Sequence, residues 1–260
     1  MTAGPRTMDG AAFSSADLAG RKGPRSVSVL IPARNEARTI GRVVEAVRAP
    51  HVAAAGGTGL VDEVVVVDDG SSDATAALAA AGGARVVSLG SGGGGKGQAM
   101  WAGLEASAGD LVVFLDADVE NTSAAFVAGL LGPLLTHEDV ALVKGFYERP
   151  LHGAPSGGGR VTQLVARPLI EVCFPELAAV RQPLAGETAA PRWVLEKVRF
   201  ADGYGVELGL LVDVARRFGV DSIAQVDLGI RVHRNRPLDE LRPQAADVLR
   251  AALDRVGLTR

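Results

Sequence analysis

Short apolar runs alternate along the first half of the chain with segments whose apolar residues recur at helical spacing. The runs predict buried strands at residues 26–31, 60–67, 84–88, 110–115 and 140–146. Helices are predicted at residues 38–48, after residue 73, at 98–107 and within 121–137. Strands that alternate with helices favour an α/β fold, in which a mostly parallel sheet is flanked by helices.

The pattern is less regular in the second half. It predicts a flexible joint at the glycines 157–159, a helix at 206–218, a strand at 222–228 and a closing helix at 238–256, interrupted near Pro243. The first 24 residues are rich in Gly, Ala, Ser and Pro and predict a mobile tail. We therefore expect a disordered tail over residues 1–25, one half of the fold over 26–145, and a second half with the closing helix over 146–260.

Composition and charge narrow the class of protein. Hydrophobic residues make up 47% of the chain, enough for a full core, and the net charge of −3 with scattered Arg and Lys argues against a nucleic-acid-binding surface. The single cysteine, Cys173, excludes an intramolecular disulfide and indicates a reducing cytoplasm. No membrane span is expected, because the longest uncharged stretch, residues 121–137, is too short and too polar.

Two carboxylates, Asp116 and Asp118, directly follow the apolar run that ends at Leu115. At the end of a strand, both can turn toward a bound diphosphate and share a hard cation such as Mg²⁺ with it. A polar turn is the plainer interpretation, since Asp-x-Asp is common by chance, but the strand context favours a metal site.

Two further polar motifs follow predicted strands. Residues 32–36 read Pro-Ala-Arg-Asn-Glu, and residues 68–73 read Asp-Asp-Gly-Ser-Ser-Asp. An acidic residue at a strand tip can accept hydrogen bonds from a base or a ribose. For Ser72 and Asp73, capping of the next helix is the preferred interpretation.

The remaining candidates carry charge beside glycines or at the start of a helix. Lys96 lies between two glycines and can pair with a phosphate, and Arg160 and Thr162 follow a glycine run that suits a phosphate or a carboxylate. Glu207 begins an apolar helix, where either the helix dipole or an acceptor explains it. His233 stands among arginines and is either a metal ligand or part of a basic surface loop.

Taken in order, the motifs at 32–36, 68–73 and 116–118 resemble the donor domain of GT-A glycosyltransferases. Further motifs narrow the resemblance to the glucosyl-3-phosphoglycerate synthase family, over about residues 26–258. They read Val-Lys-Gly-Phe-Tyr at 143–147, Gly-Gly-Arg-Val-Thr at 158–162, Pro-Leu-Ala-Gly-Glu at 183–187, Gly-Tyr-Gly-Val-Glu at 203–207 and His-Arg-Asn-Arg-Pro-Leu at 233–238.

The resemblance implies a GT-A fold with a nucleotide-sugar half (26–145) and a smaller acceptor-binding half (146–260). It implies a retaining, cytoplasmic, usually dimeric enzyme that moves glucose from UDP-glucose to the 2-hydroxyl of 3-phosphoglycerate with Mg²⁺ or Mn²⁺. The chain departs from the family pattern at Asp69, where serine is typical, in the short glycine loop before Lys96 and in the short segment 152–156.

The family's functional residues carry over to matching positions of this chain. Donor-binding positions are Pro32, Ala33, Arg34, Glu36, Asp69, Lys96, Asp116 and Ala117. Acceptor-binding positions are Gly159, Arg160, Thr162, Tyr204 and Asn235, and the metal ligands are Asp118 and His233. Positions at the reaction centre are Glu207, Lys96, Asp118 and the Leu184 carbonyl.

Several alternatives stay open at this point. The chain is expected either to transfer glucose by same-face attack with a leaving-phosphate oxygen as base, or through a covalent intermediate on Glu207. Rival functions are a mannosyl-3-phosphoglycerate synthase, a polyprenyl-phosphate sugar synthase, or a non-catalytic nucleotide-sugar binder.

Overall fold

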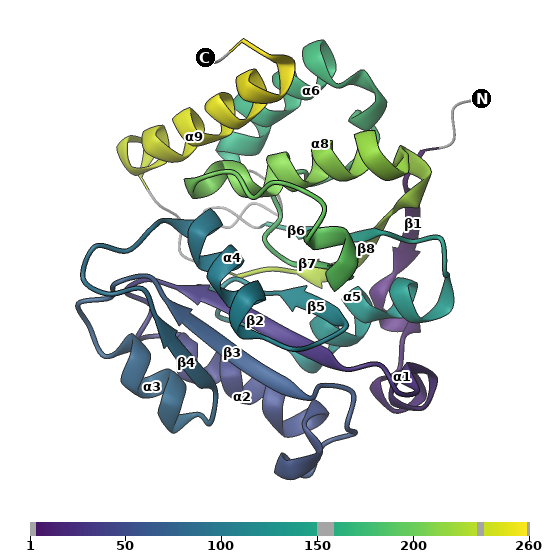
Figure 1. The fold of residues 1–260 in the computed structure, drawn as a ribbon, viewed down its shortest axis with the longest axis vertical. Coiled ribbons are helices and arrows are strands. Elements are labelled where there is room, and N and C mark those ends of the chain that lie inside the picture. The colour runs from purple at the N-terminus through teal and green to yellow at the C-terminus, as the bar shows by residue number, and fades with distance from the viewer. Residues whose placement is uncertain (1–3, 150–158, 233–236, 259–260) are drawn as a thin grey trace.

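One sheet runs through the molecule, and helices cover both of its faces (Figure 1). The computed structural model describes residues 4–149, 159–232 and 237–258. Within these residues the sheet has 8 strands in the order β1-β8-β6-β7-β5-β2-β3-β4. Neighbouring strands are parallel except at β7, which is antiparallel to both β5 and β6. The expected fold class, α/β with a mostly parallel sheet flanked by helices, is confirmed.

The strands are β1 (Arg6–Asp9), β2 (Val27–Ala33), β3 (Glu63–Asp68), β4 (Arg85–Ser88), β5 (Leu111–Phe114), β6 (Leu142–Glu148), β7 (Thr188–Pro191) and β8 (Ile223–Ile230). The helices are α1 (Ser15–Lys22), α2 (Ile40–His51), α3 (Thr75–Ala81), α4 (Lys96–Ala106), α5 (Ala124–Thr136), α6 (Arg167–Cys173), α7 (Arg192–Leu195), α8 (Val206–Phe218) and α9 (Leu238–Val256).

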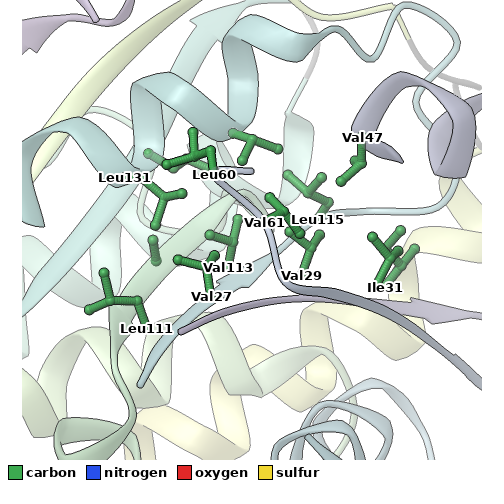
Figure 2. Packing of buried hydrophobic residues seen from close by; sticks show 14 of the residues in the cluster. Val27, Val29, Ile31, Val47, Leu60, Val61, Leu111, Val113, Leu115 and Leu131 are labelled. Atoms are coloured by element: carbon green, nitrogen blue, oxygen red, sulfur yellow. The ribbon is translucent and has the colours of Figure 1, made fainter. Parts of the chain in front are cut away.

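The central strands are buried on both faces, and alternate residues therefore enter different cores. Val27, Val29 and Ile31 of β2 pack toward α2 and α5, beside Val113 of β5 and Leu131 of α5 (Figure 2). Because both faces are covered, β2 is apolar at nearly every position, and this explains why the strand is visible in the sequence as an uninterrupted run.

A second core fills the opposite face. Leu30 and Phe114 point into it from β2 and β5, where they pack with Met100 of α4 and with the apolar stripe of α8. Helices α6 and α9 lie outside α8 and complete this side of the molecule (Figure 1). These packed layers hold α4 and α8 at fixed positions over the sheet. Each helix carries a charged residue in its first turn, Lys96 in α4 and Glu207 in α8.

Most predicted elements are present, with shifts of a few residues at their ends. Strand β7 was missed, because its sequence Thr-Ala-Ala-Pro carries no apolar run. Its small side chains are buried between β5 and β6, where the space between two cores selects small residues rather than strongly strand-forming ones.

Two expectations, one about the N-terminal segment and one about the last helix, are wrong. The described part of the expected tail, residues 4–25, is ordered: β1 pairs with β8, and α1 packs against α5 through Leu18, which is 2% exposed. Helix α9 is not interrupted at Pro243, which lies inside an unbroken helix. A proline removes one backbone donor, and here the packing of Val248 and Ala252 against the second core holds the helix together. Residues 157–158 of the expected joint lie outside the described residues.

The topology places several loops at one edge of the sheet. Strands β2, β3, β5, β6 and β8 are mutually parallel in the sheet, so the segments that follow them leave at the same edge. Strand β7 runs the other way, so the segment that precedes it reaches the same place. In open α/β sheets such an edge is where ligands bind.

Candidate active site

Two clefts adjoin each other at this edge. The first, which we call the β2–β3 cleft, is lined by Pro32, Ala33, Arg34, Glu36, Asp69, Gly95, Lys96, Ala99, Asp116, Ala117, Asp118 and Tyr204. The second, which we call the β6–α9 cleft, is lined by Lys96, Asp116, Asp118, Arg149, Gly159, Arg160, Val161, Thr162, Leu184, Tyr204, Glu207, Arg231, Leu241, Gln244 and Val248. Lys96, Asp116, Asp118 and Tyr204 line both clefts and form their junction.

The structure places all of the residues predicted to bind the donor along the β2–β3 cleft. They come from the last two residues of β2, from the segments after β2, β3 and β5, and from the first residue of α4. Asn35, with φ 57°, turns the chain sharply after β2. Its side-chain Oδ1 accepts a hydrogen bond from the Ser72 backbone N–H, with an N···O distance of 2.8 Å. This turn joins the two strand-end motifs and leaves Arg34 and Glu36 beside the cleft.

Lys96 stands between two carboxylates at the junction. Its Nζ lies 2.5 Å from Asp116 Oδ1 and 2.5 Å from Glu207 Oε1. Burial by itself lowers the pKa of Lys96, but the two carboxylates outweigh burial and hold this pKa well above its usual range. Burial likewise opposes ionisation of Asp116, yet Lys96 and Arg231 hold the pKa of Asp116 far below its usual range. Lys96 and Asp116 are therefore both charged at neutral pH.

Arg231 is a site residue that the sequence analysis did not assign. Its guanidinium is 4% exposed, and Nη2 donates to Asp116 Oδ2 at 2.8 Å and to Asp118 Oδ1 at 2.9 Å. Burial lowers the pKa of Arg231, but Glu187, Tyr147 and the two aspartates raise it well above its usual range. The residue follows β8 and precedes His233 by two positions, so alternation along the strand was the signal that could have identified it.

Asp116 and Asp118 form a pair of carboxylates whose negative charge favours a bound cation. In this structure the Arg231 guanidinium bridges them, so the carboxylate pair already holds a positive group at hydrogen-bond distance. Asp118 presents the oxygen ligands that Mg²⁺ or Mn²⁺ prefers. The other predicted ligand, His233, lies outside the described residues, and among the described residues there is no cluster of three or more metal-ligating side chains.

A buried polar network supports the segment before β7. Lys144 of β6 is 2% exposed and donates to the Ala185 carbonyl and to Thr188 Oγ1, the latter at 3.0 Å. Burial lowers the pKa of Lys144 to about 8. Glu187 accepts from the Tyr147 hydroxyl at 2.7 Å. These residues, none assigned from the sequence, fix the backbone of residues 184–187 against Asp116.

Gly186 is required for this approach. A Cβ at Gly186 would lie 2.1 Å from Asp116 Oδ1, so any side chain would displace the aspartate. Leu184, predicted to present its carbonyl at the reaction centre, lines the β6–α9 cleft as part of the same segment. Its position therefore depends on Lys144 and Glu187 beneath it.

The β6–α9 cleft contains the predicted acceptor residues that the structure describes. Gly159, Arg160, Thr162 and Tyr204 all line it, whereas Asn235 lies outside the described residues. Arg149, which was not assigned, adds a second guanidinium, and it donates to the Tyr147 hydroxyl at 2.7 Å. Two arginines lining one cleft suit an acceptor that carries more than one negative charge.

The far wall of this cleft is formed by α9, through Leu241, Gln244 and Val248. These residues carry no sequence signal of a site, because they belong to an ordinary amphipathic helix. The two clefts adjoin at Lys96, Asp116 and Asp118, so molecules bound in the two clefts would meet at these charged side chains. That arrangement suits the transfer of a group from one to the other.

Comparison with known proteins supports the same class of chemistry. The sequence model of the family described as Glycosyl transferase family 2 matches residues 28–161. The glucosyl-3-phosphoglycerate synthase of Mycolicibacterium smegmatis is 49% identical over 257 residues, covering 95% of this chain and 83% of that protein. The synthase of Mycobacterium tuberculosis is 49% identical over 255 residues, covering 93% of this chain and 77% of that protein.

Solved structures are similar along nearly the whole chain. The crystal structure of the M. tuberculosis synthase with Mn²⁺, UDP-glucose and phosphoglyceric acid has a TM-score of 0.89 and 46% identity, covering 99% of this chain and 90% of that chain. A structure of the same enzyme with Mg²⁺ and UDP has a TM-score of 0.88 and 46% identity, covering 98% of this chain and 88% of that one. Within the residues described here, no helix is both long enough and apolar enough to cross a bilayer.

Proposed function

Since this chain belongs to glycosyl transferase family 2 and to the glucosyl-3-phosphoglycerate synthases, we propose that it transfers glucose from UDP-glucose to the 2-hydroxyl of 3-phosphoglycerate, with retention at the anomeric carbon. The observation that carries the proposal is the junction of the two clefts. Lys96, Asp116 and Asp118 line both, so a donor in one cleft and an acceptor in the other meet at these charges.

In this proposal the donor occupies the β2–β3 cleft. The uridine lies against Pro32, Ala33, Arg34 and Glu36, with Asp69 at its edge, and Asp116 with Ala117 faces the ribose. Lys96 faces the diphosphate and offsets the charge that develops on the leaving UDP. The half formed by residues 26–145 thereby supplies most of the donor site.

The acceptor occupies the β6–α9 cleft. Arg160, Thr162 and Gly159 bind its phosphate and carboxylate, and Asn235 is assigned to the same group from the sequence. Tyr204 lies at the junction, where the acceptor hydroxyl has to reach the sugar. Residues 146–260 thereby supply most of the acceptor site.

Asp118 and His233 are the residues that would hold Mg²⁺ or Mn²⁺ beside the diphosphate. When bound, the ion supplies Lewis-acid stabilisation of the leaving phosphate. Two structures of the M. tuberculosis synthase contain these ions, Mn²⁺ in one and Mg²⁺ in the other. The hydrogen bonds from Arg231 to Asp116 and Asp118 support the assignment of a positive group beside this carboxylate pair.

Retention has two candidate routes, and we propose the same-face route. Glu207 Oε1 lies 2.5 Å from Lys96 Nζ, and a carboxylate engaged in a buried ion pair is a weak nucleophile. A leaving-phosphate oxygen then accepts the proton of the attacking hydroxyl. Because no covalent bond to the protein forms, Glu207→Gln is expected to keep measurable turnover and an α-linked product, whereas a covalent route would lose both.

The experiment that tests the function measures UDP release from UDP-glucose with Mg²⁺, with and without 3-phosphoglycerate, and identifies the product by NMR. The proposal expects release that depends on the acceptor and an α-linked glucosyl-3-phosphoglycerate. Release from GDP-mannose instead would point to a mannosyl-3-phosphoglycerate synthase. Binding of UDP-glucose without turnover would point to a non-catalytic nucleotide-sugar binder.

We also propose that the protein acts in the cytoplasm as a homodimer. The single cysteine is compatible with a reducing compartment, and both proposed substrates are phosphorylated metabolites. Light scattering on the purified protein tests the assembly: a mass twice that of the chain is expected, and the mass of one chain at micromolar concentration would contradict the dimer.

A further inference from the structure

Asp69, the residue after β3, is bonded to the backbone of another loop rather than to a side chain. It is 5% exposed, and its Oδ1 accepts from the Gly94 amide at 2.5 Å and from the Gly95 amide at 3.1 Å. The Gly95 amide is also 3.1 Å from Oδ2. The ion pair of Asp69 with Arg34 is longer, with Arg34 Nη1 3.8 Å from Oδ2. The strongest contacts of Asp69 are therefore to the glycine-rich loop before α4.

The loop lies so close to Asp69 that side chains do not fit between them. A Cβ at Gly93 would lie 2.5 Å from the Asp69 carbonyl oxygen, and one at Gly70 would lie 2.7 Å from the Gly90 carbonyl oxygen. Both glycines have positive φ, of 62° and 74°, which other residues rarely adopt. The glycines in this loop are thus explained by close packing onto the turn after β3.

The loop ends at Lys96, the first residue of α4. On its other side the start of α4 touches the segment before α8, because a Cβ at Gly97 would lie 1.9 Å from the Ala201 carbonyl oxygen. Asp69 and Ala201 therefore hold the first turn of α4 from two sides. The Lys96 ammonium, which must reach Asp116 and Glu207 at 2.5 Å each, depends on that placement.

We propose that Asp69 is a positioning residue for the transfer step: by holding the Gly94 and Gly95 amides it places Lys96 at the junction of the two clefts. This inference rests on the proposed function and assigns to Asp69 a role beyond contact with the donor base. The negative charge suits the role, since a carboxylate accepts several backbone N–H bonds at once near the N-terminus of α4.

Kinetics of Asp69→Ala separate this role from base contact. A residue that only touches the base raises the KM for UDP-glucose and leaves kcat unchanged at saturating substrates. A residue that positions Lys96 lowers kcat, by about tenfold to a hundredfold for a displacement near 1 Å. Asp69→Asn, which keeps one acceptor oxygen for the two amides, is expected to restore part of kcat. An unchanged kcat in Asp69→Ala would overturn the proposal.

A double-mutant cycle shows whether the effect passes through Lys96. If it does, Asp69→Ala lowers kcat in the wild type but changes it less than about twofold in a Lys96→Met background. If the double variant instead lost kcat by the product of the two single-variant fold-changes, the two residues would act independently. That outcome would contradict the proposal. Gly93→Ala, which forces the loop away from Asp69, is expected to lower kcat as Asp69→Ala does. In the Lys96→Met background, Gly93→Ala is expected to leave kcat nearly unchanged.

Two further measurements separate failure of this inference from failure of the proposed function. Hydrogen exchange needs no substrate: Asp69→Ala should speed exchange in residues 93–98 and leave β3 protected, and unchanged exchange in the loop would contradict the role of Asp69. Wild-type protein that releases no UDP would instead contradict the proposed function.

Asp62→Asn is the matched control. Asp62 also accepts a backbone amide, that of Val27 at 2.7 Å, but it precedes β3 rather than following it. This variant should lower thermal stability and keep kcat within about twofold. A kcat loss as large as that of Asp69→Ala would mean that general loosening of the sheet explains both variants.

Discussion

Charge at the scale of single residues is concentrated where the two clefts meet. Lys96 and Arg231 are each surrounded by carboxylates, and the pKa values of both cations lie well above their usual ranges. Such a cluster is costly to bury unless every member is paired. The pairing seen here balances positive against negative groups before any substrate arrives, so an anionic substrate with its metal has to reorganise these ion pairs.

Asp118 is the residue on which metal binding is predicted to depend. Asp118→Asn keeps the shape of the side chain but removes the charge that attracts the ion, so kcat should fall by more than about a hundredfold. UDP release measures the loss, and calorimetric titration with Mn²⁺ and UDP should show weaker binding of the ion. Turnover near the wild-type rate would remove Asp118 from the metal site.

Arg160 tests the assignment of the acceptor cleft. Arg160→Ala removes a guanidinium from the wall of the β6–α9 cleft, and the KM for 3-phosphoglycerate should rise about tenfold or more. The KM for UDP-glucose should stay within about twofold, because the β2–β3 cleft does not include this residue. Steady-state kinetics with each substrate varied in turn provide the check, and a change confined to the donor KM would show that the clefts are assigned the wrong way round.

At the scale of secondary-structure elements, a hydrogen bond between residues far apart in the sequence joins the end of α2 to the start of α5. His51, the last residue of α2, is fully buried, and its Nε2 lies 2.9 Å from the Ala124 carbonyl oxygen at the start of α5. Among the residues that the structure describes, none forms a hydrogen bond with its Nδ1. Both helices pack on the same face of the sheet, so this contact sets the spacing between their ends.

His51 is predicted to make stability depend on pH. Burial lowers the pKa of His51, against a raising effect from the Ala124 carbonyl. As pH falls below the ordinary histidine pKa of about 6.5, the unfolded chain takes up a proton that the folded chain does not, so the free energy of unfolding should fall. Urea denaturation at a series of pH values between 5 and 8 measures this slope.

His51→Gln is the control for that slope. Glutamine keeps a donor for the Ala124 carbonyl but does not titrate, so the dependence on pH between 8 and 5 should become shallower than in the wild type. Equal slopes in the two proteins would show that other groups account for the dependence.

At the scale of the whole molecule, the sheet joins segments from both ends of the chain. Strand β1, near the N-terminus, pairs with β8, near the C-terminus, and α1 covers α5 (Figure 1). The donor and acceptor halves proposed from the sequence therefore share one sheet, and movement of one half against the other would strain the strands between them. We expect unfolding in a single transition.

Leu18 of α1 tests the structural contribution of the N-terminal segment. The residue is 2% exposed and belongs to the core between the sheet and α5. Leu18→Ala should lower the free energy of unfolding by about 2–4 kcal/mol, from lost burial and the cavity left behind. Urea denaturation measures the change. A difference below about 0.5 kcal/mol is what a disordered tail would give.

The sequence by itself determined the alternating strands and helices, because strands buried on both faces and amphipathic helices leave regular apolar patterns. It also determined which residues follow the strands: the motifs containing Arg34, Asp69 and Asp116 lie at adjacent strand ends because parallel strands share an edge. Charge beside glycines and at a helix start also marked Arg160, Thr162 and Glu207 as candidates. The family resemblance added specific roles for them, and the structure brings them to the adjoining cleft.

Only the tertiary structure decided the rest, and the reason is distance along the chain. Strand β7 and the N-terminal segment are specified by the neighbours that bury them rather than by their own composition. Arg231, Lys144 and Glu187 acquire their roles from partners far away in the sequence, such as Asp116 and Ala185. A local pattern carries no information about such partners, because burial and pairing of a charge are properties of the assembled fold.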